Sequence, residues 1–140
     1  MARSDESALI ALTLEYADAV RNLEKERWAA TWTEDARWVL DGERDVVGRE
    51  AIVEMWSRSI AKYAHVVQLY SACTYDIDGD AASGRCEFRE LNRVLDGSAR
   101  ILAGHYDDTY RRTSDGWRFT SRQLTKYYQG PPDLTGEFFA

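Results

Sequence analysis

The stretch that decides the fold is VVQLYSACTYDIDGDAASGRCEFRELNRV, residues 66–94. Strand-forming residues fill both of its halves, and Asp78-Gly79 lies between them as a strong signal for a tight hairpin turn. The stretch therefore predicts two long antiparallel strands, at Val66–Ile77 and Ala81–Val94.

Two more turn signals follow this hairpin. Asp96-Gly97 predicts a turn before a strand at Arg100–Arg112, and Ser114-Asp115-Gly116 predicts another before a strand at Trp117–Tyr128. Gly130-Pro131-Pro132 ends the last strand, because proline cannot donate to a sheet ladder. The second half of the chain thus predicts four consecutive antiparallel strands.

The first half of the chain has helical spacing. We expect helices at residues 8–24, with Ser4 or Ser7 as the N-cap, at residues 25–32, and after Gly48, with a brief strand at Ala36–Leu40. The apolar stripes of the helices are Leu9, Leu12, Tyr16, Val20 and Leu23, then Trp28 and Trp32, then Ile52, Met55, Trp56, Ile60 and Tyr63. Helices followed by a meandering sheet predict one α+β domain over residues 1–140, with three N-terminal helices on one face of a bent sheet.

Charge, hydropathy and histidine spacing argue against several classes of partner. The 140 residues carry a net charge of -6, which disfavours a nucleic-acid partner because such binding depends on lysine and arginine neutralising phosphates. The chain has no apolar run of membrane-spanning length and no signal peptide, so we expect a cytoplasmic protein that does not bind membranes. His65 and His105 are far apart without a paired acidic motif, so no metal site is expected.

Strand parity assigns residues to the two faces of the sheet. If Ile77 pairs with Ala82, Cys73 and Cys86 face each other on the core side. A disulfide is conceivable there, but two reduced structural thiols are the favoured interpretation. The same parity places His65 on the core side.

Several polar residues also fall on or near this core side. Glu90 and Asn92 continue its apolar face, where a carboxylate is costly unless it has a binding or catalytic role. In the last hairpin, Asp107 is expected opposite Arg122, with His105 on the same face. These three residues form either an acid/base cluster or, as position favours, a solvated ion-pair ladder.

Four motifs carry a resemblance to a known family. They are Trp32-Thr33-Glu34-Asp35-Ala36, residues 47–52 (VGREAI), residues 76–81 (DIDGDA) and residues 110–119 (YRRTSDGWRF). In this order they resemble the SnoaL-like domains of the nuclear transport factor 2-like superfamily, over residues 8–136. Scytalone dehydratase, bile-acid 7α-dehydratase and hexachlorocyclohexane dehydrochlorinase are relatives. The resemblance implies a cone-shaped fold in which the curved sheet and the helices enclose one mostly apolar pocket.

The resemblance also implies where catalytic residues lie. Relatives use a tyrosine on the first helix, an aspartate five residues later and a histidine on the first long strand; here Tyr16 matches, Arg21 replaces the aspartate, and counting back from Asp76 puts Gln68 at the histidine position. Parity favours His65 for that role, whereas Gln68 requires a β-bulge. Arg122 matches a family arginine and, with Arg21, would bind an anionic group of the substrate.

Other residues are candidates for the pocket. Glu90, Asp107 or Asp108 would balance the arginines, and Tyr16 or Tyr106 would donate a proton or a hydrogen bond. The candidate substrate-binding residues are Trp28, Trp56, Phe88, Glu90, Asn92, His105, Tyr106, Asp107 and Asp108.

The resemblance favours a cofactor-independent lyase, of the dehydratase type, or isomerase acting on a small, largely apolar, hydroxylated aromatic or polycyclic compound. The alternatives are a polyketide cyclase-like aldol catalyst and a non-catalytic ligand-binding or assembly domain. A homo-oligomer is also implied, with a trimer favoured and a dimer possible.

Overall fold

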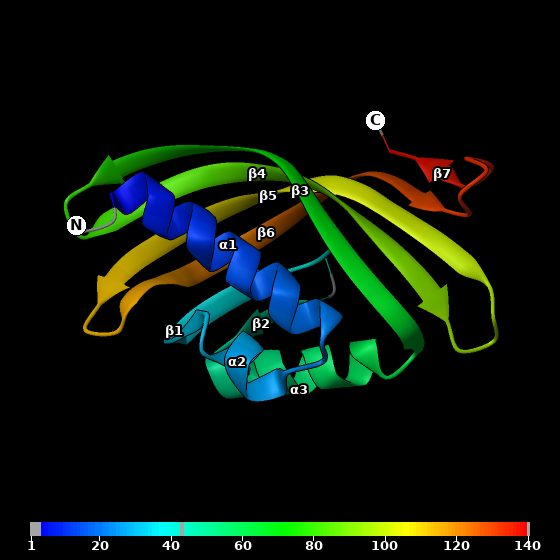
Figure 1. Ribbon diagram of the computed structural model, residues 1–140, viewed down its shortest axis with the longest axis horizontal. Helices are drawn as coiled ribbons and strands as arrows, with labels where there is room; N and C mark the ends of the chain where they lie inside the picture. The colour runs from blue at the N-terminus through cyan, green and yellow to red at the C-terminus, as the bar shows by residue number, and fades with distance from the viewer. Residues whose placement is uncertain (1–3, 43, 140) are drawn as a thin grey trace.

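Figure 1 shows the computed structural model, which describes residues 4–42 and 44–139. The described residues form three helices, α1 (Asp5–Arg21), α2 (Lys25–Ala29) and α3 (Arg49–Ile60), and seven strands, β1 (Trp32–Val39), β2 (Asp45–Val47), β3 (Tyr63–Asp78), β4 (Ala81–Val94), β5 (Ala99–Thr113), β6 (Gly116–Gly130) and β7 (Glu137–Phe138).

The strands form one mixed sheet in the order β2-β1-β6-β5-β4-β3, with β7 paired to β6. All neighbouring strands are antiparallel except β1 and β6, which run parallel. The four long strands curve strongly, and α1 crosses the concave face of the sheet (Figure 1). Helices α2 and α3 lie below α1 in this view. The α+β prediction is confirmed, but the sheet stays open between its edge strands β2 and β3 and does not close into a cone.

The helix predictions are correct in kind and wrong in some boundaries. Ser4 caps α1, its hydroxyl oxygen accepting a hydrogen bond from the Ser7 backbone N–H. The second helix ends at Ala29, so Trp32 opens β1, and Tyr63 opens β3 instead of extending the third helix. Strands β2 and β7 were not predicted, because strands of two or three residues carry almost no periodicity.

β-bulges decide which side chains face inward. Ile77 pairs with Ala82 as predicted, but Ser71 is an extra residue in β3 and reverses the alternation upstream of it. A second bulge, at Thr120 in β6, puts Asp108 opposite Arg122 in place of the predicted Asp107.

Cys73 and Cys86 are opposite each other, as strand parity predicted, and a disulfide joins them. The favoured interpretation of two reduced thiols is therefore wrong. The bond ties β3 to β4 near the middle of both strands.

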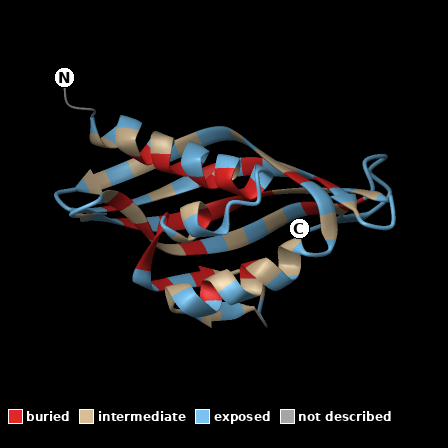
Figure 2. Cartoon of the chain, turned by 60° about the horizontal axis from the view of Figure 1, so that its bottom comes forward, coloured by how far each residue is buried: buried red, intermediate tan, exposed pale blue. Residues whose placement is uncertain are grey.

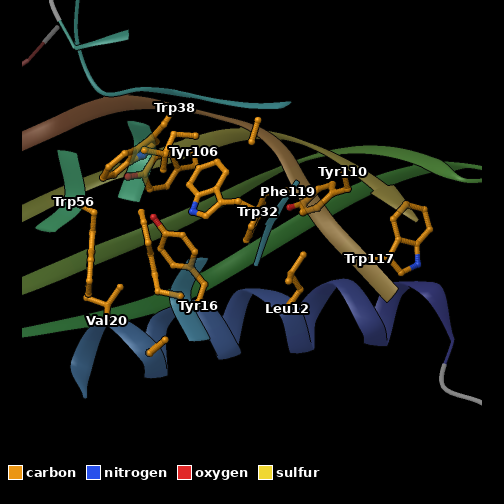
Figure 3. Packing of buried hydrophobic residues seen from close by; sticks show 14 of the residues in the cluster. Leu12, Tyr16, Val20, Trp32, Trp38, Trp56, Tyr106, Tyr110, Trp117 and Phe119 are labelled. Carbon is orange, nitrogen blue, oxygen red and sulfur yellow. The ribbon is translucent and has the colours of Figure 1, made fainter. Parts of the chain in front are cut away.

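Aromatic rings fill the core between α1 and the sheet. Leu12, Tyr16 and Val20 point from α1 toward the strands (Figure 3), and the buried residues of α1 lie on its sheet-facing side (Figure 2). Trp28 stacks on Trp56 with ring centroids 4.7 Å apart, which joins α2 to α3. This core forms one wall of the cavity described below. No helix among the described residues is long and apolar enough to cross a membrane.

Candidate active site

A cavity of about 130 Å³ lies between the C-terminal half of α1, α3 and the concave face of β3–β6. Its wall is mostly apolar, and the polar side chains on it come chiefly from the long strands. The lining residues are Tyr16, Val20, Trp38, Leu40, Arg44, Trp56, Ser59, Ile60, Tyr63, Val66, Gln68, Glu90, Asn92, Arg100, Ile101, Leu102, Tyr106, Leu124, Lys126 and Gln129.

A buried ion pair lies beneath this cavity. Arg122 has an exposed fraction of 0% and Asp108 of 2%. The guanidinium donates from Nε to Asp108 Oδ1 at 2.8 Å and from Nη2 to Oδ2 at 3.1 Å, and Tyr110 donates its hydroxyl to Oδ2 at 3.2 Å. The guanidinium also packs over the rings of Tyr106 and Phe119, at 4.0 and 4.4 Å from their centroids.

The bidentate geometry is that of an ionised pair, in which burial raises the pKa of Asp108 and the charge and hydrogen bonds of Arg122 oppose that rise. Burial acts to lower the pKa of Arg122, but the charge and hydrogen bond of Asp108 together with the nearby Tyr70 and Tyr16 outweigh burial and raise that pKa well above its ordinary value. Arg122 is therefore a fixed cation whose charge is already balanced by its partner.

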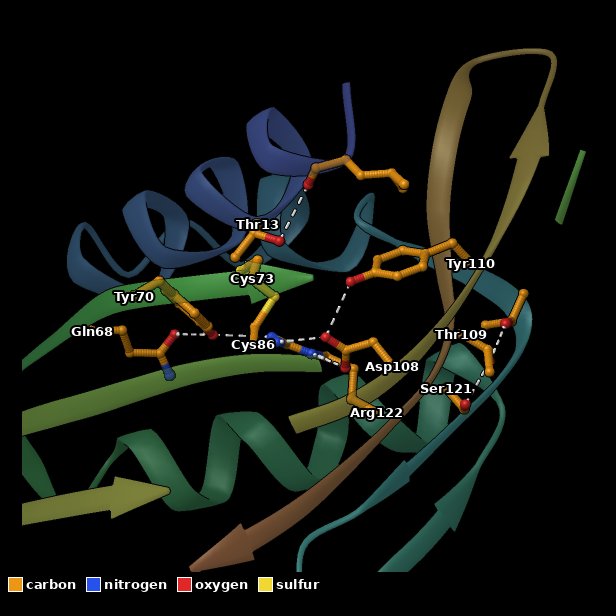
Figure 4. Close-up of polar contacts among 12 residues, drawn as sticks. Thr13, Gln68, Tyr70, Cys73, Cys86, Asp108, Thr109, Tyr110, Ser121 and Arg122 are labelled. Atoms are coloured by element: carbon orange, nitrogen blue, oxygen red, sulfur yellow. Dashed lines mark hydrogen bonds and ion pairs between the residues drawn. A yellow bond between two sulfur atoms is a disulfide. The ribbon is translucent and has the colours of Figure 1, made fainter. Parts of the chain in front are cut away.

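A hydrogen-bond chain runs from this ion pair to the cavity (Figure 4). Arg122 Nη1 donates to the Tyr70 hydroxyl oxygen at 3.0 Å, and that hydroxyl donates to Gln68 Oε1 at 3.3 Å. Gln68 Nε2 then donates to Glu90 Oε2 at 2.8 Å. Since arginine can only donate, the direction of every donation along the chain is fixed.

Glu90 ends this chain as a carboxyl group on the cavity wall. Asn92 Nδ2 donates to its second oxygen, Oε1, at 3.1 Å. Burial raises the pKa of Glu90, and the two amide donors only partly oppose the rise. Each carboxyl oxygen accepts one hydrogen bond from an amide and keeps acceptor capacity for a ligand.

Six of the predicted site residues share this cavity: Tyr16, Trp56, Gln68, Glu90, Asn92 and Tyr106. The bulge at Ser71 turns Gln68 inward, as the alternative interpretation required. Trp28 and Phe88 lie one layer behind, within the core. Burial raises the pKa of both Tyr16 and Tyr106, so their phenols are neutral hydrogen-bond donors at physiological pH.

Four other predicted residues lie elsewhere. Arg21 is exposed at the end of α1, and His65 is exposed because the bulge reverses its side of β3. His105 and Asp107 point to the opposite face of β5, where Asp107 pairs with Arg85 at 2.9 Å and with His105 at 3.2 Å. Asp107 and His105 therefore belong to an ion-pair ladder, as position favoured, but its arginine is Arg85 and not the predicted Arg122.

Arg122 was expected to bind an anionic group of the substrate, but its donors are bonded within the protein. Its Nε and Nη2 are committed to Asp108 and its Nη1 to Tyr70, and neither Arg122 nor Asp108 lines the cavity. Both residues support the wall from behind.

Sequence reasoning missed the residue that joins the two parts of the site. Tyr70 links the ion pair to Gln68, and the signal that would have found it is the inward alternation of Tyr70 with Gln68 once a bulge at Ser71 is allowed. Lys126 and Arg100 were also missed. Among the residues that the structure describes, no group of three or more histidine, cysteine, aspartate or glutamate side chains is placed to hold a metal ion.

Comparisons with known proteins agree with this architecture. The chain is 29% identical over 133 residues to the uncharacterized protein Rv2910c of Mycobacterium tuberculosis, covering 90% of this chain and 88% of that protein. It is 26% identical over 125 residues to the gamma-hexachlorocyclohexane dehydrochlorinase of Sphingobium indicum, covering 87% and 79%.

The chain also superimposes on a solved structure from Streptomyces avermitilis, described as a dehydratase of the nuclear transport factor 2-like family. The TM-score is 0.80 at 16% identity, and the match covers 87% of this chain and 95% of that one. This likeness concerns the fold. The family model described as "SnoaL-like domain" matches residues 2–123. The protein therefore belongs to the SnoaL-like domain family and has the nuclear transport factor 2-like fold.

Proposed function

We propose that this protein is a cofactor-independent lyase or isomerase in which Glu90 removes a proton from a carbon atom of a small ring compound. The observation that carries the proposal is a carboxyl group on an apolar cavity wall, held by one amide donor on each oxygen. A carboxylate with a raised pKa is a stronger base than one in water, and apolar surroundings strengthen its interaction with a developing charge.

The other cavity groups fit the remaining steps of such a reaction. As Glu90 takes the proton, the electron pair of the broken C–H bond forms a C=C bond, and either a leaving group departs or a neighbouring carbonyl becomes an enolate. The neutral phenols of Tyr16 and Tyr106 line the same cavity and would donate a hydrogen bond to that oxygen or leaving group. In an isomerase Glu90 would return the proton to another carbon.

Cavity size limits the substrate. An apolar cavity of about 150 Å³ accommodates benzene, so the cavity of about 130 Å³ here would hold one ring. This favours a single-ring compound over a polycyclic one. The dehydrochlorinase relative gives independent support for elimination chemistry on a ring.

The proposal does not use the aspartate and histidine pair of the relatives, in which Arg21 of this chain replaces the aspartate. Arg21 can only donate hydrogen bonds and is exposed, and His65 is exposed as well, so neither of them supplies the base. Their placement supports the alternative of a non-catalytic binding domain, which keeps a pocket and lacks turnover.

Deuterium wash-in separates the two functions. The protein is incubated in D₂O with single-ring ketones and with ring compounds bearing a halogen or hydroxyl leaving group, and exchange and product formation are followed by NMR. We expect exchange or elimination with the native protein and with Glu87→Gln, which alters an exposed residue of the opposite face of β4, and a loss of both with Glu90→Gln. Saturable binding of these compounds with no exchange in any protein would support the binding domain instead.

A further inference from the structure

Two cations line the candidate active site: Arg100 is exposed at its edge, and Lys126 lies on the other side of the level of Glu90 in the sheet. Arg100 lies opposite Asn92 in the register of β4 and β5, so it shares the inner face with Glu90, two residues further along β4. Lys126 is on the inner face of β6, and its Nζ donates to Gln129 Oε1 at 3.3 Å. Both side chains line the cavity.

The two cations have no anionic partner among the residues that the structure describes. The third basic residue of the cavity, Arg44, is neutralised by Asp41 at 2.7 Å. Glu137 lies opposite Gln129 in the sheet but makes no ion pair within 4.0 Å with Arg100 or Lys126. In a chain of net charge -6, two unneutralised cations beside an apolar cavity form a local anion-attracting region.

We infer that the substrate carries a carboxylate, which Arg100 binds at the exposed edge of the cavity while Lys126 adds positive charge along the wall and the ring occupies the cavity. The inference rests on the proposed function for the position of the reacting carbon. Along a strand two residues span about 7 Å and neighbouring strands lie about 4.8 Å apart, so the Cα atoms of Glu90 and Arg100 are separated by about 8 Å. One ring fits between a base at Glu90 and a carboxylate at Arg100.

The chemistry of the two groups suits this ligand. Arginine offers a planar fork of donors that matches both oxygens of a carboxylate, and the lysine ammonium keeps donors beyond its bond to Gln129. Glu90 lies further inside than Arg100 and would repel a carboxylate, so the acid is held with its charged end at Arg100.

Binding of matched acids and amides tests the inference. The probes are benzoate, phenylacetate and 3-phenylpropanoate with their primary amides, and the readout is the intrinsic fluorescence of Trp38 and Trp56 on the cavity wall. We expect at least one acid to bind about tenfold or more tightly than its amide at low salt, and the preference to shrink at high salt. The double variant Arg100→Gln/Lys126→Gln should lose the preference and keep its affinity for the amide.

Arg89→Gln is the matched control, because Arg89 is exposed on the opposite face of β4, and it should keep the preference. The inference is overturned if no acid binds saturably, if acids and amides bind equally, or if the preference survives in the double variant.

Glu90→Gln separates this inference from the proposed function. An acid preference retained in that variant, together with no exchange by the native protein on any compound, would leave the carboxylate site standing and refute the enzyme. Exchange catalysed by the native protein, with acids and amides bound equally, would support the enzyme and refute the carboxylate site.

Discussion

Replacing Arg122 by methionine would leave Asp108 as a buried, unpaired carboxylate. Methionine fills much of the same volume among the aromatic rings, so the main loss is electrostatic. Breaking a fully buried ion pair on one side costs about 3–5 kcal/mol, and both partners here are almost completely buried.

That cost is large against the whole stability of the domain. Unfolding entropy of about 2.1 cal/mol/K per residue gives about 0.29 kcal/mol/K for 140 residues. The loss then corresponds to a fall in Tm of roughly 10–17 °C, out of a free energy of unfolding of about 5–15 kcal/mol.

A bidentate pair on the surface provides the control. Arg37 donates to Asp45 from Nε at 2.8 Å and from Nη2 at 2.5 Å, which is the same geometry in solvent. Thermal and urea unfolding of Arg122→Met and Arg37→Met should show a large loss for the first and a small one for the second, since exposed pairs contribute little. Equal losses would refute the assignment of a buried ion pair to this site.

Three further changes have defined outcomes. Reducing the Cys73–Cys86 disulfide, whose cysteines are 13 residues apart, should lower stability by up to about 3 kcal/mol, seen as a reductant-dependent Tm that a Cys73→Ala/Cys86→Ala variant lacks. Gly104→Ala should destabilise the β5–β6 ladder, because its Cβ would lie 2.2 Å from the Thr125 carbonyl oxygen; an unchanged Tm would contradict this. Tyr70→Phe should cost about 1–3 kcal/mol in urea unfolding, because a guanidinium N–H and an amide oxygen lose their partner; a neutral result would show that the chain is not continuous.

Much of the fold was predictable because strong local signals set it. The Asp78-Gly79 turn and the alternating residues around it were enough to fix the pairing of Ile77 with Ala82 and of Cys73 with Cys86. The apolar stripe of the first helix likewise predicted which side of α1 faces the sheet.

The errors have one main physical cause. A single extra residue reverses the facing of every residue beyond it, and a bulge has no reliable mark in one sequence. The bulge at Ser71 moved His65 outward and Gln68 inward, and the bulge at Thr120 exchanged Asp107 for Asp108 as the partner of Arg122. Glu90 was placed correctly because no bulge separates it from Cys86 in β4.

The most direct test of this account is an NMR titration of the Glu90 side-chain carboxyl, assigned with Glu90→Gln. Burial places its pKa above the ordinary value of 4.5, and Gln68 lowers it through a hydrogen bond. A raised folded-state pKa means that the basic form, and any exchange activity, grows as pH rises through it, while the contribution of Glu90 to stability is lost over the same range.

We expect a midpoint above 4.5 in the native protein and a higher one in Gln68→Leu, which removes one of the two donors to the carboxylate. A midpoint at or below 4.5, or one that Gln68→Leu leaves unchanged, would contradict Glu90 as the base on the wall of this cavity.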